Sequence, residues 1–161
     1  MRNIAFVALV MSGALAGPPA PAQGPWAWPV GEGIRPVVAA PFKLPVQQWD
    51  AGHRGIDLVT RPGADVTSVA DGVVTHRGRI AGRGTVSVTH PGGVRSTYEP
   101  VDSTLAVGQQ VRRGQRIAGI GHEPGHCAPG TCLHLGAKRG ATYLEPMTFF
   151  GARRVVLLPL D

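Results

Sequence analysis

The chain has 161 residues, with 16 Lys and Arg against 10 Asp and Glu, and a formal net charge of +6 at pH 7. This length is sufficient for one domain with a buried core and excludes an array of several domains. The positive charge favours an anionic partner such as a cell wall, a membrane surface or a nucleic acid, and indicates nothing about the fold.

Residues 1–22 have the features of a secretory signal peptide. Arg2 supplies one positive charge, an apolar run follows it, and Ala20 and Ala22 fit a small-x-small cleavage pattern. The apolar run is shorter than the roughly 20 residues that cross a bilayer, which argues against a membrane anchor. We therefore expect an exported protein of the cell wall or extracellular space, whose mature chain keeps a net charge of +5.

Residues 23–30 are expected to form a proline-rich linker, because Pro25 and Pro29 continue a stretch that is already rich in proline. The folded domain is accordingly expected over residues 31–161. Short β-prone runs interrupted by glycine dominate from Val66 onward, and a Gly-Gly hairpin signal joins two of them. No long helical period occurs after the signal peptide. The pattern predicts an all-β domain, either an antiparallel two-sheet sandwich or a small barrel.

A first candidate for metal chemistry is the H-x-x-x-D motif formed by His53 and Asp57. Gly55 between them gives the backbone freedom to turn both side chains toward one point. Imidazole nitrogen and carboxylate oxygen are both good zinc ligands. Taken alone, the pair is also compatible with an ordinary surface contact.

The run CLHLG supplies a third candidate ligand, His134. Strand alternation would place His134 on the face opposite to Leu133 and Leu135, which belong to a packed layer. Two histidines and one carboxylate would leave the fourth position of a tetrahedral zinc open for water, which distinguishes a catalytic site from a structural one. The alternative is a hydrogen-bonded histidine beside the sheet.

Cys127 and Cys132 are the two cysteines of the chain, and they enclose a short stretch with Pro129 and Gly130, which favour a tight turn. In the oxidising compartment of an exported protein they are expected to form a disulfide. The alternative is that Cys132, which shares a strand face with the third candidate ligand, becomes a fourth zinc ligand and closes the site.

The order of these motifs resembles the lysostaphin-type (LytM-type) zinc metallopeptidases, which are β-rich peptidoglycan endopeptidases. The matching motifs are H-x-x-x-D at His53 and Asp57, V-x-V-x-H ending at His90, T-Y-x-P at Tyr98, V-R-R-G-Q-x-I-A-x-I-G, and L-H at His134. The resemblance implies an open groove between two sheets, with zinc held by His53, Asp57 and His134. It also implies that a cell-wall peptide enters the groove past Tyr98.

Two positions depart from the family pattern. The family usually has a histidine where this chain has Pro100, and another where it has Cys132. The resemblance assigns these histidines to activating water or stabilising the oxyanion. Because peptide cleavage needs a proton acceptor and a proton donor for the leaving amine, their loss requires a replacement.

Glu99, His122 and His126 are the candidates for that replacement. Glu99 is next to Pro100, but strand alternation is expected to turn it to the opposite face. His122 and His126 lie in a glycine- and proline-containing loop shortly before the candidate metal strand. Either could reach the metal, and either could instead be a solvated loop histidine.

These observations favour an exported zinc metallopeptidase that hydrolyses peptide bonds in peptidoglycan. The alternative is a catalytically degenerate domain that keeps the metal site and binds peptidoglycan or activates a separate cell-wall hydrolase. A nucleic-acid partner is not expected, because the arginines lack the aromatic stacking partners that single-strand binders use. No signal for an oligomer is visible, so a monomer is expected.

Overall fold

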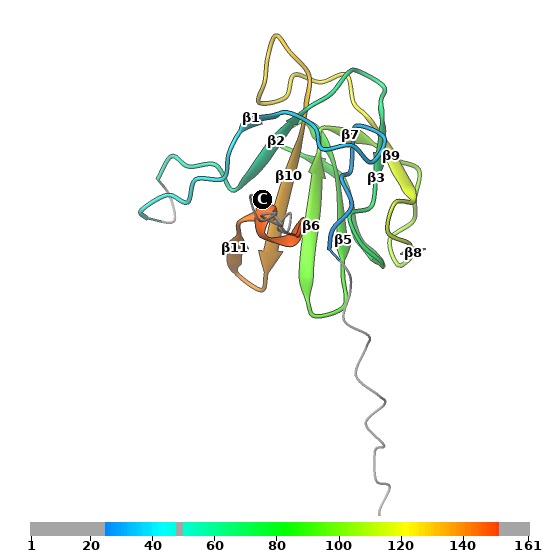
Figure 1. Cartoon of the computed structure of the whole chain (residues 1–161). Coiled ribbons are helices and arrows are strands. Elements are labelled where there is room, and N and C mark those ends of the chain that lie inside the picture. Colours follow the sequence, from blue (N-terminus) through cyan, green and yellow to red (C-terminus); the bar gives the residue numbers. More distant parts are fainter. Residues whose placement is uncertain (1–24, 48–49, 152–161) are drawn as a thin grey trace, which may run out of the picture.

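The computed structural model describes residues 25–47 and 50–151, so the expected signal peptide at residues 1–22 lies outside the described residues. The regular elements of the described chain are almost all β-strands (Figure 1). The strands are, in chain order, β1 Val38–Ala40, β2 Gly55–Val59, β3 Asp65–Thr67, β4 Gly72–Ile80, β5 Arg83–Thr89, β6 Val94–Glu99, β7 Val101–Asp102, β8 Gln110–Val111, β9 Arg116–Ile120, β10 Cys132–Arg139 and β11 Thr142–Leu144, and the 3-10 helix η1 is Pro146–Phe149.

Two antiparallel sheets make up the domain. The larger has the order β1-β2-β10-β6-β5-β4-β8, with β11 paired to β10, and the smaller has the order β3-β9-β7. The smaller sheet approaches the larger where β7 lies against β5 (Figure 1). The prediction of an all-β fold with two antiparallel sheets is confirmed, in an open form and not as a closed barrel. Within the described residues, no helix has the length and apolar character to cross a membrane.

Strand β10 shows how the sequence pattern orients the sheet. Leu133 and Leu135 are completely buried in the core, while His134 between them is only half-buried. Because neighbouring side chains of a strand point to opposite faces, the leucines fix which face His134 occupies. Burial of each leucine contributes about 1.5–3 kcal/mol, so the core holds this orientation firmly.

The predicted linker at residues 23–30 is wrong for the part that the structure describes. Trp26 is 7% exposed and Val30 is 2% exposed, and both belong to the hydrophobic core. The indole of Trp26 stacks on Phe149 with 4.5 Å between the ring centroids, and its backbone N–H donates to the Phe149 carbonyl over 2.8 Å. Proline content suggested a spacer, but a proline-rich segment can also run extended over a core, and its tryptophans supply the apolar surface for that packing.

Tyr98 does not line the groove, contrary to expectation. Its side chain is fully buried, because it is the register partner of Leu135 and therefore lies on the core side of the sheet. Its hydroxyl accepts a hydrogen bond from the backbone N–H of Val69 and lies 3.0 Å from the hydroxyl of Ser96. Tyr98 thus organises the core beneath the groove and does not contact a substrate within it.

His90 completes this buried polar network. Its Nδ1–H donates to the Asp71 carbonyl over 2.8 Å, and its Nε2 lies 2.8 Å from the hydroxyl oxygen of Ser96. Because a carbonyl only accepts, Nδ1 carries the proton of the neutral ring and Nε2 accepts from Ser96. Burial lowers the pKa of His90 below its ordinary value of 6.5, although the hydrogen bond and charge of Asp71 act in the opposite direction.

This lowered pKa predicts a loss of stability in mild acid. The unfolded chain takes up a proton on this histidine near its ordinary pKa, whereas the folded chain resists the proton until a lower pH. The contribution of His90 to the free energy of unfolding is therefore fully present above about pH 6.5 and decreases as the pH falls toward the folded pKa. Urea unfolding of the wild type and His90→Gln at stepped pH measures it. A shallower pH slope for the variant is expected, and equal slopes would contradict the assignment.

Candidate metal centre

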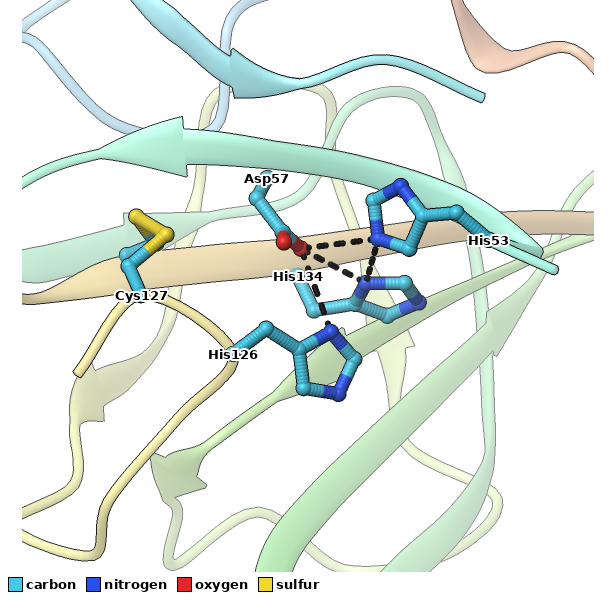
Figure 2. The surroundings of a disulfide bond; sticks show 6 residues. His53, Asp57, His126, Cys127 and His134 are labelled. Carbon is cyan, nitrogen blue, oxygen red and sulfur yellow. Dashed lines mark hydrogen bonds and ion pairs between the residues drawn. A yellow bond between two sulfur atoms is a disulfide. The ribbon is translucent and has the colours of Figure 1, made fainter. Parts of the chain in front are cut away.

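Four polar side chains converge on one face of the larger sheet. They are His53, Asp57, His126 and His134, each of which offers one donor atom, and these atoms all lie within 4.8 Å of one another (Figure 2). The structure therefore brings together the three ligands expected from sequence and adds His126, one of the loop candidates. His122, the other loop histidine, is exposed and does not belong to this cluster.

One carboxylate oxygen is the common neighbour of the three imidazoles. Oδ1 of Asp57 lies 2.8 Å from Nδ1 of His134, 3.1 Å from Nε2 of His53 and 3.4 Å from Nδ1 of His126. The ring nitrogens of His53 and His134 are 3.1 Å apart. Donor atoms about 2.0–2.1 Å from a tetrahedral zinc are separated from one another by roughly 3.3 Å, so the spacing and the nitrogen and oxygen chemistry of this set fit zinc.

The strand register explains why two of these residues meet. His134 of β10 is the register partner of Asp57 of β2 on one side and of Glu99 of β6 on the other. Register partners point to the same face, so Asp57, His134 and Glu99 form one row across three neighbouring strands. We call this row the centre row. His53 enters it from the segment just before β2, where its Nδ1 donates to the Pro41 carbonyl over 2.8 Å.

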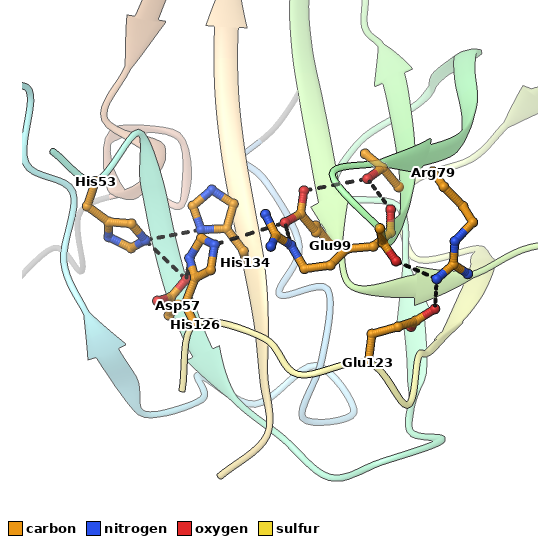
Figure 3. Close-up of polar contacts among 10 residues, drawn as sticks. His53, Asp57, Arg79, Glu99, Glu123, His126 and His134 are labelled. Carbon is orange, nitrogen blue, oxygen red and sulfur yellow. Dashed lines mark hydrogen bonds and ion pairs between the residues drawn. The ribbon is translucent and has the colours of Figure 1, made fainter. Parts of the chain in front are cut away.

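Glu99 faces the cluster, so the expectation that it turns away is wrong. The expectation took Pro100 as part of the same strand, whereas β6 ends at Glu99 and the register with His134 decides its direction. The carboxylate of Glu99 forms an ion pair with Arg83 and lies 4.0 Å from Nε2 of His126 (Figure 3). Glu123 of the loop pairs separately with Arg79.

A disulfide fixes the loop that carries His126. Cys127, the next residue, is bonded to Cys132, the first residue of β10 and two positions before His134 (Figure 2). The loop histidine and the strand histidine are therefore connected through a covalent bridge as well as through the backbone. The sulfur of Cys132 is used in this bond, which removes it from the set of metal ligands.

The electrostatics of the cluster favour an ionised carboxylate at Asp57. Burial alone would raise the pKa of Asp57, but the hydrogen bond from His134 and the charges of His134, His53 and His126 outweigh burial and hold it below 3.8. Burial and the nearby His134 lower the pKa of His126 below 6.5, against the opposing charges of Asp57 and Glu99. The cluster therefore offers the negative charge of Asp57 to a cation.

Gly55 is required where the ring of His134 lies over β2. A methyl group at position 55 would lie 2.7 Å from Cε1 and Nε2 of His134 and 2.5 Å from the Leu135 carbonyl oxygen. Gly55→Ala is expected to displace the imidazole and to lower zinc affinity by at least about tenfold, as loss of a supporting contact does at metal sites. Competition with a chromophoric chelator measures the affinity.

Gly136→Ala is the matched control, because Gly136 is the register partner of Gly55 and its added methyl group would meet no atom closer than 3.6 Å. This variant is expected to keep wild-type zinc affinity. Equal affinities for the two variants would show that the glycine does not position His134.

An open groove extends from the cluster along the larger sheet. Its volume is 440 Å³, and its lining includes Glu99 and His134 at one end and Arg95, Lys138 and Tyr143 farther along. A larger hollow of 880 Å³, lined by other parts of the chain, contains none of the four clustered side chains. Of these two hollows, the groove is therefore the one that adjoins the cluster, through His134.

A two-sheet β domain with histidine and aspartate donors converging beside a groove has the arrangement expected of a metallopeptidase-type domain. The family model described as peptidase family M23 matches residues 51–146. This match covers more than half of the sequence and includes all four clustered side chains. The chain belongs to peptidase family M23.

Curated relatives include uncharacterized protein Rv2891 of Mycobacterium tuberculosis, which is 39% identical over 132 residues and is matched over 78% of this chain and 52% of its own length. DD-carboxypeptidase/endopeptidase Mpg of Neisseria meningitidis is 31% identical over 97 residues, covering 60% of this chain and 22% of the relative. The chain thus spans about half the length of the curated relatives that match it over the most residues.

Solved structures share the fold. A zinc-containing peptidase from Vibrio cholerae superposes with a TM-score of 0.63 at 28% identity, over 78% of this chain and 40% of the other. A mutant form of the catalytic domain of the prophage-encoded M23 protein EnpA from Enterococcus faecalis gives a TM-score of 0.57 at 18% identity, over 71% of this chain and 92% of the other. The second likeness concerns the fold alone.

Proposed function

We propose that this protein is an exported zinc metallopeptidase that hydrolyses peptide bonds in bacterial peptidoglycan. The observation that carries the proposal is the convergence of His53, Asp57 and His134 at one end of an open groove. Membership of peptidase family M23 supports it, as does a relative named DD-carboxypeptidase/endopeptidase. The sequence of residues 1–22 and the disulfide support export.

His53, Asp57 and His134 would hold the zinc ion. When bound, zinc supplies Lewis acidity, which polarises a peptide carbonyl and makes water acidic enough to react near neutral pH. The three protein donors leave room for a fourth position, as a catalytic site requires. The rings of both histidines are half-buried, and His134 lines the groove, where an extended peptide can reach it.

His126 is proposed as the proton acceptor that replaces the two histidines missing from the family pattern. Its Nδ1 faces the cluster, 3.4 Å from Asp57, and its Nε2 faces Glu99 at 4.0 Å. In the tautomer with the proton on Nε2, toward Glu99, the Nδ1 lone pair faces the reacting centre. His126 can then accept a proton from water at Nδ1 and return it to the leaving amine.

A catalytically degenerate domain is the second candidate, favoured by Pro100 and by Cys132. Neither residue can transfer a proton here, because proline has no ionisable group and Cys132 is held in a disulfide. Such a domain would bind peptidoglycan peptides in the groove or activate a separate cell-wall hydrolase. A monomer without a nucleic-acid partner is proposed in both cases.

Purified mature protein with one zinc per chain, incubated with isolated cell walls and synthetic wall peptides, tests the proposal. Mass spectrometry is expected to detect cleaved peptides, and their formation is expected to stop when a chelator removes the zinc and to resume when zinc is restored. A folded, zinc-loaded protein that binds walls without releasing any peptide would overturn the enzyme and support the degenerate domain.

A further inference from the structure

The floor of the groove has a regular order along β6 and β10. Successive register pairs on the same face, each two residues further along the strands, are Glu99 with His134, Thr97 with Gly136, and Arg95 with Lys138. The first pair belongs to the centre row, the second is small, and the third is doubly cationic. Because a strand rises about 3.3 Å per residue, the cationic pair lies roughly 13 Å from the centre row.

Arg95 and Lys138 form an unfavourable pair unless something anionic binds them. Side chains directly opposite on neighbouring strands have Cβ atoms about 4.5–5.5 Å apart, and like charges in this position are destabilising. Ion pairs of the described residues include those of Arg79, Arg83 and Arg116, and neither Arg95 nor Lys138 takes part in one of these. The fold therefore concentrates positive charge at this end of the groove without neutralising it.

Tyr143 orders the cations at this end. It is the register partner of Lys138 on β11, and its ring centroid lies 5.0 Å from Nζ of Lys138 and 5.7 Å from Cζ of Arg54. Contact with an aromatic ring restrains a long cationic side chain and reduces the entropy it loses when a ligand binds. Lys138 is also half-buried, so solvent screens its charge less than at an open surface.

The two ends of the groove differ in charge. The centre row has the carboxylates of Asp57 and Glu99, whereas the far end has Arg95 and Lys138, with Arg54 beside them. An acidic group on a peptide is attracted to the second end. A guanidinium also matches a carboxylate geometrically, through two parallel hydrogen bonds.

We propose that Arg95 and Lys138, supported by Tyr143 and Arg54, form a carboxylate-binding subsite that selects peptides with an acidic group about four residues from the bond at the metal centre. The spacing follows from the roughly 13 Å between the ends, since an extended peptide covers about 3.3–3.6 Å per residue. The subsite rests on the proposed peptidase function, for which it defines the class of substrate. The carboxylate comes from an acidic side chain or from the C-terminus of the peptide.

Fluorescence anisotropy with dye-labelled peptides tests the subsite by binding alone. The probes are acetylated eight-residue peptides of alanine and glycine with a single Glu or Gln, each made with a free C-terminus and as the amide, so that the two sources of carboxylate are separated. The zinc-loaded protein carries His126→Ala in every measurement, which suppresses turnover equally. Peptides with a carboxylate are expected to bind about tenfold more tightly than the Gln amide.

Lys138→Gln together with Arg95→Gln is expected to abolish this preference, while Lys138→Arg keeps it. Arg112→Gln is the matched control, because Arg112 is exposed and does not line the groove. Arg112→Gln also removes one positive charge, but away from the groove, and is expected to keep the full preference. Thermal unfolding of the double variant verifies folding, and its melting temperature is expected to be unchanged or higher because a like-charge pair is removed.

Equal binding of all four peptides, a preference that survives the double variant, or an equal loss in Arg112→Gln would each overturn the subsite. Cleavage by the chain with native His126 separates the two proposals. If all four peptides are cut with equal kcat/KM, the peptidase function stands and the subsite fails. If the preference in binding is present and no peptide is cut, the subsite stands and the peptidase function fails.

Discussion

His134→Ala is expected to abolish zinc binding at the centre and, with it, peptide hydrolysis. His134 lies between Asp57 and Glu99 in the centre row, and its Nδ1 is 2.8 Å from the carboxylate of Asp57. Removal of an outer partner of a ligand already costs about 10- to 100-fold in metal affinity, so removal of a ligand is expected to cost more than 100-fold. The core is expected to remain folded, because the leucines on either side of His134 are unchanged.

Two measurements test this prediction. One is the zinc content after dialysis against a weak chelator, determined by mass spectrometry of the metal, and the other is the rate of wall-peptide release. His122→Ala is the control, because this histidine is exposed and outside the cluster. It is expected to keep one zinc per chain and full activity. Retention of one zinc by His134→Ala would remove His134 from the ligand set and, with it, the metal centre proposed here.

His126→Ala is expected to lower kcat by about 10²- to 10⁴-fold while zinc content stays at one per chain. This range is the typical contribution of a positioned general acid or base. Zinc is expected to stay bound while kcat falls, because His53, Asp57 and His134 supply three donors without His126. Glu99→Gln, which removes the charge facing Nε2 of His126, is expected to give a smaller decrease in kcat with zinc retained.

The comparison of His126→Ala with His134→Ala distinguishes the two roles that the cluster allows. If His126→Ala loses zinc as His134→Ala does, His126 is a fourth ligand and the site is a closed, structural one. If kcat is unchanged, His126 has no part in proton transfer. Circular dichroism and a thiol titration verify that each variant keeps the fold and the disulfide between Cys127 and Cys132.

The alternation of apolar and polar residues along short segments of the sequence predicted the fold. On β10, leucines and a histidine alternate with period two, and the structure places them on the core face and the groove face in that order. The same alternation could not give the direction of Glu99 and Tyr98, because their strand end is set by the turn at Pro100 and by the register with β10. The face of a short strand depends on its partner, and one sequence does not name that partner.

Sequence patterns could not predict the position of His126, for a related reason. A loop has no period that orients its side chains, and its path here is set by contacts far along the chain. The adjacent Cys127 was the available signal, since its bond to Cys132 limits how far the loop can move from β10. The linker prediction was wrong for Trp26 because proline content indicates only the backbone conformation. The burial of the Trp26 side chain depends on stacking with the distant Phe149.

The centre row forms only when β10 pairs in the correct register, so folding and formation of the metal site depend on the same strand pairing. If β10 paired with its neighbours one residue out of step, Leu133 or Leu135 would replace His134 beside Asp57, and the imidazole would enter the apolar interior. Such a misfolded chain would lose apolar burial and gain an unsatisfied ring nitrogen at once, so it is heavily disfavoured. A register shift of β10 that would destroy the metal site is therefore also strongly unfavourable for folding.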